Sequence, residues 1–137
     1  MRSRIRCLSF ITLMALIAGC GGLSKYPVEG KIVFSDDTPA TELAGFTVSF
    51  DRDDGAYGAS GEVKPDGTFS ISTELEGDGA VPGKYFVAIT PPEPLIDAPR
   101  PPLIIRREYG DLRASGLEQE IKPGKNVITL KVERLKK

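Results

Sequence analysis

The sequence contains no histidine and no tryptophan, and only 2 of its 137 residues are cysteine. Histidine is the usual general base beside a serine or cysteine nucleophile, so neither a Ser-His-Asp nor a Cys-His arrangement can be assembled. This absence restricts the catalytic chemistry of the chain more than any motif that is present. An enzyme built on this sequence would have to use carboxylates alone.

Both cysteines, Cys7 and Cys20, lie near the N-terminus. The chain from residue 21 onward therefore contains neither a free thiol nor a disulfide. Redox chemistry at cysteine is excluded for that part of the protein.

Basic charge is limited as well, with 18 lysines and arginines against 19 acidic residues and a net charge of −1. Adjacent basic residues occur only at Arg106-Arg107 and Lys136-Lys137. A nucleic-acid-binding protein needs a basic patch as its electrostatic footprint. We therefore expect no nucleic acid partner.

The first twenty residues have the layout of an export signal. Three arginines at positions 2, 4 and 6 precede an uncharged apolar run at 7–18, which leads into Ile17-Ala18-Gly19-Cys20. A basic start, an apolar stretch of ~7–15 residues and small residues before the cut define a signal peptide. The segment resembles the lipobox of secreted bacterial lipoproteins. This resemblance implies cleavage between Gly19 and Cys20, lipid acylation of Cys20, and attachment of the mature protein to a membrane.

Three other interpretations of this segment remain open. A transmembrane helix needs ~20 apolar residues, whereas the run at 7–19 is shorter and ends in Gly-Cys-Gly-Gly. An ordinary secretory signal could be cut among the small residues of 15–19, but it gives no reason for a cysteine at the boundary. A buried core helix would place three arginines directly before it. We favour the lipoprotein signal.

Removal of residues 1–19 leaves 137 − 19 = 118 residues, with 15 basic and 19 acidic side chains and a net charge of −4. A chain of this length buries roughly two thirds of its unfolded surface, which is enough for one core. The small residues of 20–25 predict a short flexible tether. We expect one domain at 26–137.

Short stretches of alternating apolar residues with turn residues between them predict an all-β fold, a seven-stranded antiparallel sandwich. The clearest strand is 45–51, and 84–90 is apolar on both faces, which predicts a central strand. The small, polar 57–64 predicts an edge strand. Pro65-Asp66-Gly67 predicts a tight hairpin, because glycine supplies a positive φ. The predicted strands are 27–34, 45–51, 57–64, 68–73, 84–90, 117–121 and 127–132.

The long connection at 91–116 has two halves. Its proline-rich part, 91–102, predicts extended polyproline II segments at ~3.1 Å per residue. Its second part, 103–112, permits one or two helical turns. The proline segment would be either a recognition ligand for an aromatic groove or a rigid connection packed along the sandwich. We favour the packed connection.

Four motifs together resemble one family. They are Val28 to Phe34, Gly45 to Phe50, Asp66-Gly67-Thr68-Phe69 and Pro82-Gly83-Lys84-Tyr85. This pattern is similar to the carboxypeptidase regulatory-like domain, a transthyretin-like (prealbumin-like) Greek-key sandwich of seven strands. Behind a lipobox, it resembles a group of small single-domain bacterial lipoproteins. Hydrolases and dioxygenases of related folds use histidine, so their sites cannot be mapped onto this chain.

Two candidate binding features follow. Asp51, Asp53 and Asp54 lie in a loop that ends in glycine, and hard oxygen ligands of this kind suit Ca²⁺. A solvated turn explains the same residues equally well, and the acidic loop at 74–79 has the same ambiguity. Tyr109 is a candidate contact for a sugar or peptide, whereas Tyr85 occupies an inward strand position and is expected in the core.

The sequence therefore predicts a lipid-anchored protein of the bacterial cell envelope with a noncatalytic binding or structural role and no cofactor. Its partner would be an envelope protein or polysaccharide. Gly21 after the lipidated cysteine is compatible with the outer membrane, so we expect the outer membrane or periplasmic face. The alternatives are a carboxylate-dependent hydrolase and a carrier of a small apolar ligand between sandwich subunits.

Overall fold

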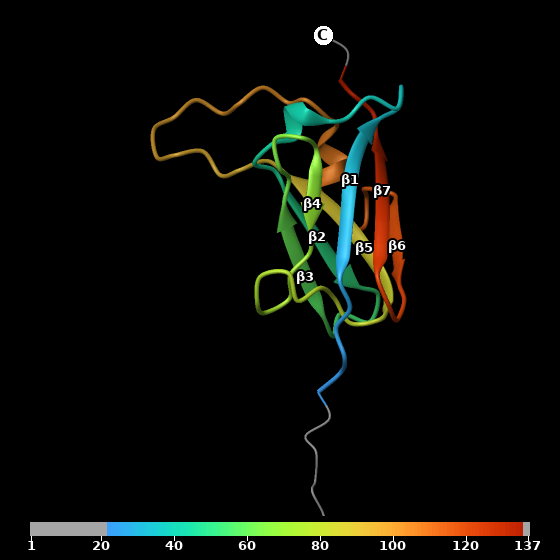
Figure 1. The fold of residues 1–137 in the computed structure, drawn as a ribbon. Helices are drawn as coiled ribbons and strands as arrows, with labels where there is room; N and C mark the ends of the chain where they lie inside the picture. The colour runs from blue at the N-terminus through green and yellow to red at the C-terminus, as the bar shows by residue number, and fades with distance from the viewer. Residues whose placement is uncertain (1–21, 136–137) are drawn as a thin grey trace, which may run out of the picture.

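The computed structural model describes residues 22–135 and forms a sandwich of two β-sheets (Figure 1). One sheet has the strand order β4-β1-β7 and the other β3-β2-β5-β6. Residues 1–21, which contain Gly19 and Cys20, lie outside the described residues. The strands are β1 (Val28–Phe34), β2 (Thr47–Arg52), β3 (Gly58–Glu62), β4 (Thr68–Ser70), β5 (Gly83–Thr90), β6 (Leu117–Ile121) and β7 (Asn126–Val132).

The all-β prediction and all seven predicted strands are confirmed. Strand β6 begins and ends at the predicted residues, and most other strand ends lie within two residues of prediction. Strand β5 lies between β2 and β6, as its two apolar faces predict, and the small residues of β3 form a sheet edge. Alternation succeeds here because successive side chains of a strand point to opposite faces of the sheet.

Strand β4 is shorter than predicted and ends at Ser70 rather than at Thr73. The chain crosses between the sheets at this point. Ser72 exchanges two backbone hydrogen bonds with Ser60 of β3, at 2.9 and 2.8 Å, so it pairs with the opposite sheet. Alternation continues through the crossing because Ile71 still faces the core.

The antiparallel prediction is wrong for one strand pair. Strands β1 and β7 run parallel along their full length, from Val28 opposite Asn126 to Phe34 opposite Val132. The other four strand pairs are antiparallel. Alternation specifies which face of a strand is buried, but it carries no information about the direction of the neighbouring strand.

Three aromatic rings join the two sheets at the centre of the core. Phe50 of β2 lies between Phe69 of β4, with ring centroids 6.4 Å apart, and Tyr85 of β5, at 6.1 Å. Each ring is no more than 2% exposed. The Tyr85 hydroxyl donates a hydrogen bond of 2.8 Å to the Val81 carbonyl oxygen, which satisfies its polar group inside the core. The prediction that Tyr85 belongs to the core is confirmed.

Gly30 of β1 makes room for this aromatic cluster. A Cβ atom at this position would lie 2.2 Å from the tip of the Phe69 ring. The paired strands β1 and β4 place Gly30 directly opposite Phe69. The ring therefore covers the bare backbone of Gly30, and a larger residue at position 30 would displace it.

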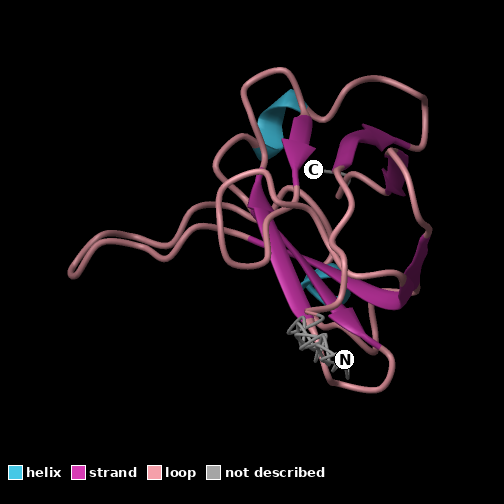
Figure 2. Ribbon diagram, turned by 60° about the horizontal axis from the view of Figure 1, so that its bottom comes forward, coloured by secondary structure: helices cyan, strands magenta, loops and turns pink. Residues whose placement is uncertain are grey.

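The proline-rich segment projects from the sandwich instead of packing along it. We refer to residues 91–103 as the proline arm, and all of them are exposed. The arm runs outward and back as an extended loop in Figure 1 and reaches away from the body in Figure 2. The expected packed connection is therefore wrong. Six of its residues are proline, which cannot donate a backbone hydrogen bond to a sheet edge.

The two ends of the sandwich differ in what they carry. At the tether end, shown at the bottom of Figure 1, the described chain enters β1. At the opposite end, which we name the distal end, β1 finishes, the proline arm projects and the described C-terminus leaves β7. Two short 3₁₀ helices complete the fold, η1 (Thr41–Leu43) and η2 (Arg107–Gly110). Helix η2 falls within the part of the insert for which helical turns are predicted.

Candidate functional site

The tip of the proline arm exposes two large aliphatic side chains. Leu95 is 82% exposed and Ile96 is 94% exposed. A turn holds them at the tip, because the Ala98 N–H donates a 2.9 Å hydrogen bond to the Leu95 carbonyl oxygen. Asp97 completes the turn with a φ of 70°, a conformation that aspartate tolerates better than most residues. The tip is therefore a small apolar knob on a proline-stiffened support.

A cavity of about 420 Å³ lies at the base of the arm. We name it the arm-base cavity. Its walls come from the core end of the sandwich, from both branches of the arm, and from the start of η2. They include Phe46, Ile89, Pro92, Ile105 and Arg107. The size lies within the ~300–1,000 Å³ of ordinary ligand pockets, and most of the wall is aliphatic, aromatic or proline.

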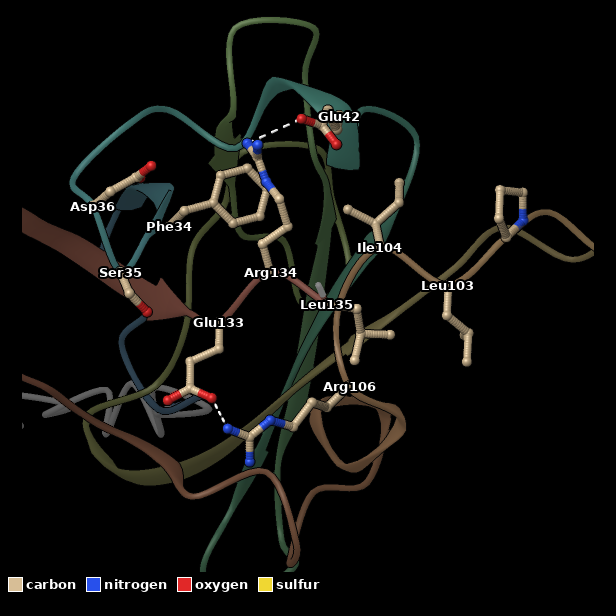
Figure 3. A pocket seen from close by; sticks show the side chains of 11 residues that line it. Phe34, Ser35, Asp36, Glu42, Leu103, Ile104, Arg106, Glu133, Arg134 and Leu135 are labelled. Atoms are coloured by element: carbon tan, nitrogen blue, oxygen red, sulfur yellow. Dashed lines mark ion pairs between the residues drawn. The ribbon is translucent and has the colours of Figure 1, made fainter. Parts of the chain in front are cut away.

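A larger, open groove of about 1,100 Å³ adjoins the base of the arm, and Figure 3 shows the side chains that line it. We refer to it as the distal groove. Arg134 crosses its floor with its guanidinium carbon 4.1 Å from the centre of the Phe34 ring. The same guanidinium is 2.9 Å from a carboxylate oxygen of Glu42. This stacked and paired arrangement places a rigid, planar cation beside an aromatic surface.

A second ion pair closes the other side of the distal groove, between Arg106 and Glu133 (Figure 3). The backbone next to Arg106 is hydrogen-bonded to the C-terminal segment, because the Leu135 N–H donates a 2.8 Å hydrogen bond to the Ile104 carbonyl oxygen. Ile105 also forms an isolated bridge with Arg134. The chain that follows the arm is therefore held against the C-terminal segment at the base of the arm.

Tyr109 takes part in this fastening. Its ring is half-buried against the core, and its hydroxyl oxygen accepts a 3.1 Å hydrogen bond from the Glu133 N–H. The structure thus places the candidate contact residue where it supports the distal groove from below. Tyr109 is not one of the groove-lining residues.

The tether end is fastened by a separate set of contacts. The Lys25 ammonium is 2.9 Å from Asp78 and 2.5 Å from Glu74, both in the loop that follows β4. Tyr26 and Ala80 exchange two backbone hydrogen bonds, at 2.9 and 3.0 Å. Gly79 permits this pairing, since a Cβ atom there would lie 1.8 Å from the Tyr26 carbonyl oxygen. The chain is therefore held in place from Lys25 onward.

Asp78 organises the loop beside the tether. Its carboxylate accepts hydrogen bonds from the backbone N–H groups of Thr73, Glu74 and Leu75, at 2.7, 3.1 and 3.1 Å. Together with the Lys25 ammonium, these donors hold the pKa of Asp78 well below its ordinary value, and the lysine contributes most. The anionic form is the one that all four donors stabilise.

Comparison with known proteins adds no further information. A scan against protein-family models, a search of curated proteins and a search of solved structures each returned no match of significance.

The acidic side chains of the loop at 51–54 are not gathered into one cluster of ligands. Within residues 22–135, no group of three acidic side chains is placed to hold a metal ion. Asp54 instead pairs with Arg52 and accepts a 3.0 Å hydrogen bond from the Ala56 N–H. The arginine pair and this backbone bond lower the pKa of Asp54. We carry the calcium hypothesis for Asp51, Asp53 and Asp54 no further.

The carboxyl groups with shifted pKa values all shift in one direction. Among the described residues, the pKa is lowered at each such aspartate because side-chain or backbone donors bind its anionic form. A glycosidase acid needs the opposite shift, since it must keep its proton near neutral pH. These carboxylates stabilise turns and loops. They are Asp36, Asp54, Asp66, Asp78 and Asp111.

Sequence reasoning did not identify the apolar tip or the stacked arginine. Leu95 and Ile96 lie between prolines and belong to no run of alternating apolar residues. Such an isolated apolar pair indicates exposed side chains. The contact of Arg134 with Phe34 joins the ends of β1 and β7, and only the tertiary structure brings those ends together.

Within the described part of the chain, no helix has the length and apolarity needed to cross a membrane.

Proposed function

We propose that this protein is a lipid-anchored, noncatalytic binding module of the bacterial cell envelope, with a sandwich of the transthyretin-like type. Acylation of Cys20 would attach it to the periplasmic or outer membrane surface. The distal end, with the proline arm and the distal groove, is the binding surface.

The observation that carries this proposal is the arrangement of the two ends. The chain enters the sandwich at one end, where Lys25 is fastened to Asp78, and the proline arm projects at the other (Figure 1). A module attached through residues ahead of Lys25 would present its arm and groove away from the membrane. Loops on a rigid scaffold are the usual location of binding residues.

The length of the tether limits the distance between the bilayer surface and the distal end of the sandwich. Four residues, 21–24, separate the acylated cysteine from the fastened Lys25, and the eight steps from Cys20 to Val28 reach at most ~27 Å at ~3.4 Å per residue. Strand β1 adds seven residues at ~3.3 Å, which is ~23 Å. The distal end would therefore operate within ~50 Å of the bilayer surface, so a partner must be available at that depth of the envelope.

The noncatalytic role is supported by the chemistry of the described residues. The chain has no histidine, and from residue 21 onward it has no thiol. Its shifted aspartates favour the anionic form, which suits structural hydrogen bonds rather than proton donation. In the distal groove, the arginines are paired with carboxylates, an arrangement that suits recognition of a surface.

Metabolic labelling with palmitate in a bacterial host tests the anchor. The wild-type chain and Cys7→Ser are expected to incorporate the label, whereas Cys20→Ser is not. Cys7→Ser is the matched control because it removes the only other cysteine and leaves the lipobox intact. Several acyl chains together give stable membrane attachment. The labelled proteins should therefore sediment with membranes, and Cys20→Ser should not.

Equal labelling of Cys20→Ser and wild type would refute the proposal. Membrane sedimentation of an unlabelled protein would refute it too, because attachment would then have another cause.

A further inference from the structure

We propose that the partner of the proline arm is a second copy of this chain. Two arms would lie side by side in opposite directions, and each Leu95-Ile96 tip would enter the arm-base cavity of the other copy. This inference deepens the proposed function, on which it rests for the role of the distal end as a binding surface. Each copy of the chain carries both members of two complementary pairs of features, one apolar and one electrostatic.

The first pair of complementary features is apolar. Leu95 and Ile96 expose most of their side-chain surface to water at the tip. The arm-base cavity offers Leu103, which is 46% exposed, and several exposed prolines, within about 420 Å³. Residues 95–99 are not among those that line the cavity, so each tip lies away from the cavity of its own copy. Both surfaces lose contact with water if the tip of one copy fills the cavity of the other.

Two-fold symmetry makes the geometry of this pairing self-consistent. The lining residues place the cavity between the branches of the arm on the side of the sandwich, and the tip lies at the outer end of the arm, which Figures 1 and 2 show as a projecting loop. When two identical arms lie antiparallel, the distance from tip to cavity is the same in both copies, so both tips reach their cavities together. Such an isologous contact closes on itself and yields a dimer rather than a chain of copies.

The second pair of complementary features is electrostatic. Asp97 is at the tip of the arm, and Arg107 lines the cavity at its base. Antiparallel pairing therefore brings Asp97 of one copy near Arg107 of the other. Glu93 and Arg100 occupy the middle of the two branches, so the same pairing places each near the opposite charge. None of these four residues forms an ion pair within the described structure.

The available surface suits a stable interface. The thirteen residues of the arm, 91–103, are exposed, and the walls of the cavity add further residues on each copy. Together they approach the roughly 20 residues a side of a standard interface. Proline restricts the arm before association, so less conformational entropy is lost when the arms pair. Attachment of both copies to one membrane would raise their effective concentration further.

Sedimentation equilibrium of the full chain in density-matched detergent tests the proposal. The wild type should form a dimer whose population rises with concentration. The combined variant Leu95→Ser with Ile96→Ser should raise the dissociation constant at least about a hundredfold, because burial of one aliphatic side chain is equivalent to about a tenfold change in affinity or more. The matched control combines Leu75→Ser with Val127→Ser, which are similarly exposed but lie outside the arm, and it should dimerise normally.

Charge reversal in the middle of the arm provides a second test that does not alter the tip. Glu93→Arg gives an arm with two basic residues in its middle, and Arg100→Glu gives one with two acidic residues. Each variant alone should dimerise more weakly than the wild type, because like charges would face each other. An equimolar mixture of the two should recover the dimer. Both positions are exposed and lie outside the core, so circular dichroism should show unchanged folding.

Three outcomes would overturn the pairing: a monomer at every concentration, a dimer that persists in the tip variant, or assembly into species larger than a dimer. These outcomes are separate from the fate of the anchor. A labelled but monomeric protein would refute the pairing and leave the lipid anchor standing. An unlabelled protein that forms the tip-dependent dimer would refute the anchor and support the pairing.

Discussion

Replacement of Phe50 by alanine tests whether the three aromatic rings hold the two sheets together. Phe50 is 1% exposed and contacts a ring of the opposite sheet and one of its own. Loss of a buried phenylalanine side chain costs about 3–5 kcal/mol, and the loss of two aromatic pairs favours the upper part of this range. We expect the free energy of unfolding to fall by about 4–5 kcal/mol, against a total of ~5–15 kcal/mol for a domain.

Chemical denaturation followed by far-UV circular dichroism measures this change, since the chain has no tryptophan to report by fluorescence. The midpoint temperature should also fall by roughly 15–20 °C, at about 4 °C per kcal/mol for a domain of this size. Leu75→Ala is the control, because its side chain is 73% exposed and the change should stay within ~0.5 kcal/mol. A loss below about 2 kcal/mol for Phe50→Ala would show that the rings are not a central contact.

Two further substitutions test other parts of the argument. Gly30→Ala should lower the free energy of unfolding by about 1–3 kcal/mol, because the added methyl group overlaps the Phe69 ring, and denaturant titration would measure it. Recovery in the combined variant with Phe69→Leu would support this cause, and a neutral Gly30→Ala would contradict it. Asp78 has a lowered pKa, so its carboxylate stabilises the fold above the unfolded pKa of about 4, and this contribution is lost as the pH falls below that value. Asp78→Asn should therefore be less stable than wild type at neutral pH, and the gap in midpoint temperature should narrow on acidification. A gap that stays constant with pH would contradict the role of the Lys25 contact.

The candidate site was only partly predictable. The order of basic, apolar and small residues before Cys20 predicts a lipid anchor. That prediction is based on the sequence alone. The position of the proposed binding surface could not be predicted in this way. The distal groove joins the end of β1 to residues after β7, with Arg134 stacked on Phe34 across 99 intervening positions, and no local pattern encodes such a contact.

The proline arm shows the same limit. Its composition predicts a stiff, extended segment, because proline restricts φ and lacks an N–H group, and the arm does run as an extended loop (Figure 1). Whether such a segment lies along the sandwich or projects from it depends on the shape of the surface beside it. The fastening of Ile104 to Leu135 decides this, since it holds the return branch at the distal end and leaves residues 91–103 in solvent.

The sequence by itself determined the seven strands, the tight turn at Asp66-Gly67 and the burial of Tyr85. Each depends on short-range physics, in which alternate side chains face opposite sides and glycine adopts a positive φ. The predicted hairpin is wrong beyond that turn, because β3 and β4, which the turn joins, belong to different sheets. The tertiary structure alone decided the parallel pairing of β1 with β7, the direction of the arm and the two ends of the module. These features depend on contacts between residues far apart in the chain, and strand alternation is the same whichever neighbour a strand acquires.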